Sequence, residues 1–258
     1  MTEPSIKVVA LGDAAVVVRL CETLDRPEET LAGMLASVER LRAAKLPAVA
    51  EITPAFASIG VFFNSKSLAA ATPAESTLES LIAKISAFVG QAKDAEKARQ
   101  SRALEIPVCY EPEFAPDLAL VAEHANLTEA EVVRRHSSAH YRVQCVGFTP
   151  GFPYLSGLPP ELATPRRATP RKWVPPGSVA IAGRQSGIYP AASPGGWNVI
   201  GRAPLRLFDP QENPPALLQA GDRVRFRAIT WEEFETAVAA VHDRRSDYGS
   251  ISQPPRQS

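Results

Sequence analysis

The chain has 258 residues, of which 45% are hydrophobic and 22% are charged. This composition is typical of a globular protein with one large or two modest domains. Lysine plus arginine and aspartate plus glutamate both number 28, so the formal net charge is zero. A neutral balance argues against the basic surface that a DNA- or RNA-binding protein needs, and it leaves little charge repulsion against a protein partner.

The apolar runs indicate neither a signal peptide nor a membrane span. The N-terminal run is interrupted at Gly12 and Asp13, and no run approaches the roughly 20 residues needed to cross a bilayer. The three cysteines, Cys21, Cys109 and Cys145, form no CxxC pair, so we expect them to be buried and reduced. We therefore expect the chain in the cytoplasm, with no contact to a membrane or to nucleic acid.

The first hundred residues predict a small α+β sandwich. Gly12 and Asp13 separate two Val-rich runs, which is typical of a tight hairpin. Apolar residues recur at helical spacing in two later segments, and Pro47 is expected to end the first helix. Both helices should cover one face of an antiparallel sheet that a strand at 103–109 closes. The expected elements are strands at 6–11 and 14–20, a helix at 28–46, strands at 49–53 and 58–63 with Pro54 between them, and a helix at 75–92.

From residue 104 onward the pattern predicts a β-rich, barrel-like domain. Thr128 and Glu131 fit the T-x-x-E capping pattern of a helix that ends near His136. Short strands then alternate with glycine and proline at close intervals, as in closed all-β domains. We expect domains at 1–100 and 101–242 and a disordered polar tail at 243–258. The elements expected here are helices at 117–124 and 128–136 and strands at 141–147, 178–182, 198–202 and 223–229.

Residues 147–196 combine ten prolines and eight glycines with large aromatic side chains. Proline restricts the backbone, glycine admits shapes that other residues avoid, and aromatic rings supply apolar area to bury. We therefore expect a rigid loop region that packs on the barrel and presents a surface to a ligand or a partner. The aromatic residues are Phe148, Phe152, Tyr154, Trp173 and Tyr189, followed by Trp197.

Four basic residues lie within seven positions of the same segment, with Glu161 the only acidic residue nearby. The planar fork of arginine suits a carboxylate or a phosphate. A substrate carboxylate, a phosphorylated intermediate or an acidic partner surface would fit, and a solvated stretch with scattered ion pairs is the alternative. The four residues are Arg166, Arg167, Arg171 and Lys172.

His136 is the candidate acid–base residue. A histidine near a helix end can exchange protons near neutral pH, and alternatively it stabilises the helix dipole. No metal is predicted on this chain, because no cysteine, carboxylate or second histidine accompanies His136 at metal-ligand spacing. The sequence also lacks the GxSxG pattern of a serine hydrolase and the glycine-rich loop that binds phosphate.

The motifs GFTPGFPYLSGL, PRRATPR, GSVAIAG and SPGGW follow one another between residues 147 and 197. In this order they resemble the signature region of the 5-oxoprolinase B-subunit family, also called the allophanate hydrolase subunit 1 or KipI family. The resemblance is strong over residues 104–229 and holds only in outline before them. It implies an α+β fold with a small N-terminal sandwich and a C-terminal cyclophilin-like β-barrel.

The resemblance also implies a subunit that is inactive alone. Such a chain acts directly with the C subunit of the enzyme, and together with the A subunit the assembly converts 5-oxoproline to glutamate using ATP. ATP is expected to act at the level of the complex, because this chain has no phosphate-binding loop. Two alternatives stay open: a regulator that inhibits a sensor histidine kinase, and a subunit of a system that processes urea or allophanate.

Functional residues follow from the motif positions. His136, Arg166 and Arg171 are expected to face a cavity shared with the C subunit, where the arginines would hold the carboxylate of a small amide or lactam substrate. His136 is the expected catalytic residue. The other residues expected at a substrate or partner interface are Tyr141, Phe148, Pro150, Phe152, Tyr154, Gln185, Tyr189 and Trp197.

Overall fold

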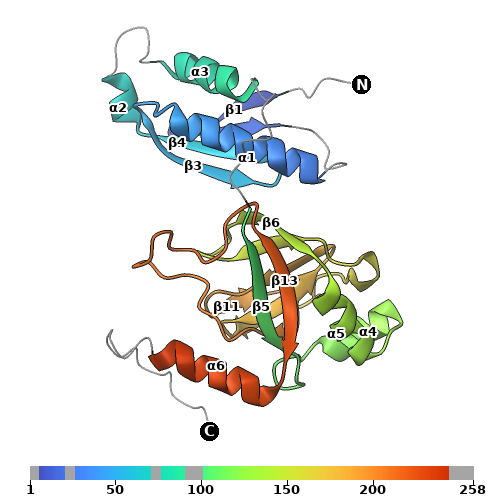
Figure 1. Ribbon diagram of the computed structural model, residues 1–258. Helices are drawn as coiled ribbons and strands as arrows, with labels where there is room; N and C mark the ends of the chain where they lie inside the picture. Colours follow the sequence, from blue (N-terminus) through green and yellow to red (C-terminus); the bar gives the residue numbers. More distant parts are fainter. Residues whose placement is uncertain (1–5, 21–26, 71–76, 91–100, 244–258) are drawn as a thin grey trace. The chain divides into compact units, whose positions relative to one another are not determined.

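The computed structural model describes residues 6–20, 27–70, 77–90 and 101–243. Contacts divide the chain into two compact units (Figure 1). The N-terminal unit comprises residues 1–102 with 144–146 and 220–222, and the barrel unit comprises 103–143, 147–219 and 223–258. The tail expected from residue 243 lies outside the described residues beyond its first position. The predicted α+β class, with an N-terminal sandwich and a C-terminal barrel, is confirmed.

The N-terminal unit is an antiparallel sheet in the order β1-β2-β4-β3, with helices on one face. Alternate residues of the central strands, such as Val16 and Ile59, point to that face and are fully buried. They meet helix residues at helical spacing, such as Leu31 and Ile85. The bounds are β1 Lys7–Leu11, β2 Ala15–Arg19, α1 Pro27–Ala43, β3 Val49–Ala55, β4 Ser58–Phe63, α2 Ser65–Ala69 and α3 Leu78–Gly90.

Three expectations for this unit need correction. The first helix ends at Ala43, before Pro47, because Lys45 adopts a left-handed φ of 44° that a helix cannot contain. Pro54 lies within β3, where it is tolerated because β3 is an edge strand. The segment 103–109 does not close this sheet and instead forms β5 of the barrel.

The second unit is a closed barrel in the strand order β10-β7-β6-β13-β5-β12-β9. Its first and last strands in the chain, β5 and β13, pair in parallel from Ala103 with Arg223 to Cys109 with Ile229, and they lie side by side in Figure 1. The strands are β5 Ala103–Cys109, β6 Tyr141–Val146, β7 Pro153–Ser156, β9 Ser178–Ala182, β10 Gln185–Ile188, β12 Asn198–Arg202 and β13 Arg223–Ile229, with a separate ribbon of β8 Arg171–Val174 and β11 Ser193–Gly195.

Helices cover parts of the barrel unit. The predicted cap of α5 is confirmed, because the Thr128 hydroxyl accepts a hydrogen bond from the Glu131 amide at 3.2 Å. The last helix, α6, was not predicted. It packs through Phe234 against Phe114, with ring centroids 4.5 Å apart. The bounds are α4 Leu118–Ala125, α5 Glu129–Ser138, the 3-10 turn η2 Pro160–Leu162, and α6 Trp231–Asp243.

We expected residues 147–196, the proline-rich segment, to form a loop that packs on the barrel. That expectation is wrong, because the segment forms part of the barrel itself. It supplies β7, β9 and β10 of the barrel wall and the β8–β11 ribbon. Position 187 in β10 requires glycine, because an added Cβ would lie 2.8 Å from the Phe152 ring and 3.0 Å from the Trp197 ring. Glycine therefore lets two large rings press against the strand.

Candidate functional site

The ring of His136 lies fully buried among the barrel strands. It stacks on Phe226 of β13 with ring centroids 4.6 Å apart. Its Nδ1 is 2.8 Å from the Tyr110 hydroxyl, and its Nε2 is 3.1 Å from the Ser186 hydroxyl. The ring of His136 thus has no exposed surface in this chain, and the cavity shared with a partner stays a prediction.

The partners of His136 select one tautomer. The Ser186 hydroxyl donates to the carbonyl oxygen of Ala180 at 3.2 Å, so it accepts from Nε2–H of His136. Nδ1 then accepts from the Tyr110 hydroxyl. Burial lowers the pKa of His136 to about 3 and raises the pKa of Tyr110. The ring is thus neutral at physiological pH, and both nitrogens are satisfied.

Tyr141 joins the same buried group. Its hydroxyl donates to the backbone carbonyl of His136 at 3.0 Å, and its ring centroid is 5.3 Å from that of His136. Only 2% of Tyr141 is exposed, so it contributes to the core and not to the surface of this chain. The predicted site residues His136 and Tyr141 are therefore in contact. In this chain their contact attaches α5 to the barrel and does not form an exposed site.

Two of the four basic residues bind a carboxylate that the sequence analysis did not single out. Asp117 is 2% exposed and directly precedes α4. Arg171 binds it with both terminal nitrogens, at 2.6 and 2.9 Å, and Arg167 donates to it at 2.5 Å. The Val199 amide in β12 donates to it at 2.7 Å. Asp117 therefore ties the basic stretch to both α4 and β12.

This arrangement changes the role expected for Arg171. A guanidinium that already holds a carboxylate by two hydrogen bonds is not free to clamp a substrate anion. Glu161, the acidic residue close in sequence, pairs instead with Arg135 of α5. An aspartate before a helix usually caps that helix, but the Asp117 side chain makes no capping bond. Sequence position alone gave no signal for its arginine partners.

Five of the predicted aromatic residues form one group, which we call the aromatic cluster. The Phe152 ring lies at its centre, with edge contacts to Phe148, Tyr154, Tyr189 and Trp197 at centroid distances of 5.7, 4.9, 5.2 and 5.4 Å. Three of the rings are buried and Tyr154 is partly buried, whereas Phe148 is 65% exposed. The cluster therefore has a buried base and an exposed rim.

The rim carries unusual features. Phe148 has a backbone φ of 68°. Residues other than glycine rarely adopt this conformation, and those that do are concentrated at functional sites. Trp173 of β8 is 60% exposed beside Val174, which is buried against the aromatic cluster. Burial raises the pKa of Tyr189, while the nearby positive charge of Arg166 opposes the rise. The charge of exposed Arg166 therefore acts on Tyr189, in the buried base of the aromatic cluster.

The remaining predicted residues lie outside these contacts. Pro150 is exposed, and Gln185 is partly exposed at the start of β10. Cys109 and Cys145 are free and buried, as expected, and burial raises the pKa of both thiols, that of Cys145 to about 11. Cys21 lies outside the described residues. Within the described ranges, no group of three or more potential metal ligands is found, and no helix has the length and apolarity to cross a membrane.

Residues 6–218 match the family described as the carboxyltransferase domain, subdomains C and D. The chain belongs to this family. The matched range contains the N-terminal sheet, Asp117, the basic stretch and the aromatic cluster, and it ends before β13 and α6. The carboxyltransferase-domain match thus covers the candidate site but not the strand that closes this barrel.

Curated relatives of this carboxyltransferase-domain chain are similar over nearly their whole length. The 5-oxoprolinase B subunit of Bacillus subtilis (strain 168) is 41% identical over 87% of this chain and 93% of the relative. That of Escherichia coli O157:H7 is 44% identical over 84% of this chain and 93% of the relative. The urea carboxylase structure of Kluyveromyces lactis matches 92% of this chain and 23% of its own, with a TM-score of 0.71 and 19% identity, a likeness of fold.

We predict that His136 makes the folded chain sensitive to mild acid. Its pKa is lowered to about 3 in the folded chain and is about 6.5 when unfolded. Stability is therefore fully present above pH 6.5 and falls by up to about 1.4 kcal/mol per unit as pH drops toward 3. Urea unfolding at pH 7 and pH 5 should show a steeper loss for the wild type than for His136→Gln. The exposed control His140→Gln should keep the wild-type slope, and equal slopes in all three would contradict the assignment.

We also predict that Asp117→Asn lowers the free energy of unfolding by about 2–3 kcal/mol at pH 7. The variant keeps the side-chain shape but leaves two guanidinium groups without their shared charge, and the partial exposure of both arginines moderates the loss. Glu161→Gln removes an exposed ion pair and should cost less than about 1 kcal/mol. Urea denaturation measures both, and equal losses would refute a central role for Asp117.

Proposed function

We propose that this chain is the B subunit of a 5-oxoprolinase, the complex that hydrolyses 5-oxo-L-proline to L-glutamate. One observation carries the proposal: relatives of that name are 41% and 44% identical and are matched over 93% of their length. The urea-processing alternative has less support, because the urea carboxylase structure shares only 19% identity and shows the fold alone.

The reaction opens a lactam. The bond between the ring nitrogen and the carbonyl carbon breaks, water supplies the oxygen of the new carboxylate, and the nitrogen becomes the amine of glutamate. We propose that ATP hydrolysis drives this step in the assembled complex. Another subunit would bind the ATP, a view supported by the lack of a glycine-rich phosphate loop in this sequence.

The buried groups of this chain support a non-autonomous role. His136 is neutral, enclosed and bonded through both ring nitrogens, so the acid–base group of the reaction is proposed to come from a partner. Arg171 is held by Asp117. Arg166 is exposed and makes no hydrogen bond or ion pair with the described residues. The anion-binding role proposed for the arginines therefore moves to Arg166.

We further propose that the C subunit contacts the rim of the aromatic cluster directly and that the A subunit joins the assembled complex. Phe148 and Trp173 supply exposed aromatic area, the kind of side chain that dominates the energetics of protein interfaces. Arg166 supplies an exposed cation whose charge acts on Tyr189 of the same cluster. This combination suits a partner surface with apolar and acidic groups.

The deciding test of the proposed function is glutamate formation from 5-oxo-L-proline and ATP by the purified A and C subunits, with and without this chain. We expect turnover only when all three are present. Full turnover by the A and C subunits alone, or none in any mixture of folded subunits, would overturn the proposal.

The rim should determine the affinity for the C subunit. We predict that the double variant Phe148→Ser/Trp173→Ser weakens binding of the C subunit at least tenfold, because two exposed aromatic contacts are lost. Leu120 of α4 is also an exposed apolar residue, at 45%. Leu120→Ser is therefore the matched control and should bind as the wild type does in calorimetric titration. Unchanged affinity of the double variant would place the interface elsewhere.

A further inference from the structure

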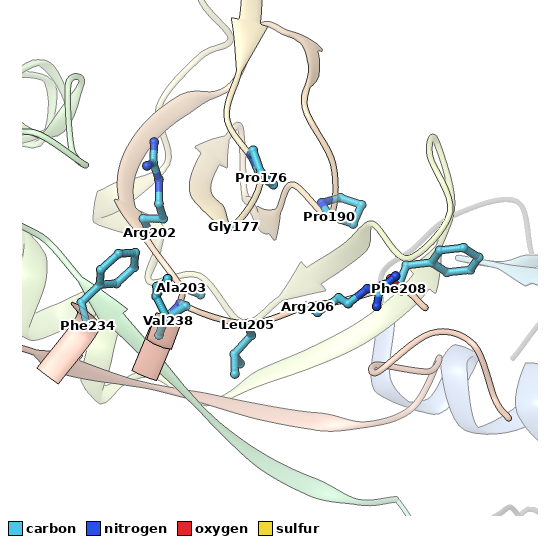
Figure 2. A pocket seen from close by; sticks show the side chains of 11 residues that line it. Pro176, Gly177, Pro190, Arg202, Ala203, Leu205, Arg206, Phe208, Phe234 and Val238 are labelled. Atoms are coloured by element: carbon cyan, nitrogen blue, oxygen red, sulfur yellow. Dashed lines mark hydrogen bonds between the residues drawn. The ribbon is translucent and has the colours of Figure 1, made fainter. Parts of the chain in front are cut away.

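A pocket of about 480 Å³ lies in the barrel unit, and no member of the aromatic cluster lines it (Figure 2). It is bordered by the turn before β9, the segment that follows β12, and helix α6. Its volume falls within the range of small-molecule sites, roughly 300–1,000 Å³. Its lining is mostly apolar and includes Pro176, Pro190, Leu205, Phe208, Phe234 and Val238.

Arg202, the last residue of β12, lines the same pocket. Its guanidinium carbon lies 4.7 Å from the centroid of the Phe114 ring. Its Nε is buried without a hydrogen-bond partner, and its guanidinium makes no hydrogen bond or ion pair to the described residues. Burial lowers the pKa of Arg202, and Glu113 opposes this only through longer-range attraction. The pocket therefore contains a partly desolvated cation without a bound counter-charge.

A second arginine of the pocket provides an internal contrast. Arg206 forms an ion pair with Asp209, and its Nε donates to the Phe208 carbonyl at 3.1 Å. Figure 2 shows Arg202 and Arg206 on opposite sides of the pocket. Both line the same cavity, but only Arg202 lacks a hydrogen-bonding partner among the described residues.

We propose that this pocket binds a small organic carboxylate with an apolar body. The carboxylate satisfies the terminal nitrogens of Arg202, because a guanidinium matches two carboxylate oxygens with two parallel hydrogen bonds. The prolines, Leu205 and the phenylalanines enclose the apolar body. An inorganic anion would leave these walls in water, and a neutral apolar molecule would leave the guanidinium unpaired.

The test is calorimetric titration of the purified full chain with cyclopentanecarboxylate and with the uncharged cyclopentanecarboxamide. We expect saturable binding of the carboxylate and at least tenfold weaker binding of the amide, because the two probes differ chiefly in the charge that Arg202 recognises. Absence of saturable carboxylate binding, or equal binding of both probes, would overturn the proposal. The assay needs no partner subunit, so its result is independent of 5-oxoprolinase activity.

Matched variants locate the site. Arg202→Met should weaken carboxylate binding at least tenfold, whereas Arg206→Met, which removes a neutralised arginine from the same pocket, should stay within about twofold of the wild type. Val238→Trp keeps Arg202 and fills the cavity from α6, so it should also abolish binding. Circular dichroism selects the folded variants for titration. Wild-type affinity in folded Arg202→Met or Val238→Trp would refute the assignment.

Discussion

The buried carboxylate of Asp117 is the constraint on which the arrangement of the barrel unit depends. A charge in a low-dielectric interior persists only when it is paired and hydrogen-bonded. Asp117 meets this condition by binding Arg167, Arg171 and the Val199 amide. These contacts join the start of α4, the β8 end of the basic stretch and strand β12 at one point. Val174 of β8 and Val199 of β12 belong to the same buried core as the base of the aromatic cluster, so this ionic junction holds two strands that support the cluster.

The histidine that the sequence marks as chemically active has a different role in the fold. His136 lies in a directional chain of hydrogen bonds from Tyr110 to Ser186 and on to the Ala180 carbonyl. Such a chain specifies one tautomer and one packing arrangement, because any rotation would leave a buried polar group unsatisfied. The chain of bonds links α5 to the barrel wall. Chemistry proposed for this protein then depends on its surface and on its partners.

Local sequence patterns predicted the elements that depend on local physics. The Gly12 turn, the Thr128 cap and the valine-rich strands follow from backbone conformation and side-chain alternation, and the structure has them. The strand predicted at 178–182 is present as β9, but β7, β8, β10 and β11 of residues 147–196 were missed, because the glycine and proline content of that segment masks the alternation. The pairing of Asp117 with Arg171 spans 54 positions, and neither propensity nor periodicity reports on such a contact. The aromatic cluster could be predicted as a set of residues, but not as a buried base with an exposed rim.

The parallel pairing of β5 with β13 has a consequence for biosynthesis. One of the two neighbours of β5, the first strand of the barrel, is β13 at Arg223–Ile229, about 120 positions later in the chain. During translation the β5 edge toward β13 therefore stays unpaired until residues 223–229 have left the ribosome. Contacts of such long sequence separation form slowly, and open strand edges invite association with other chains. A nascent chain of this topology therefore presents an open strand edge to other chains for most of its synthesis.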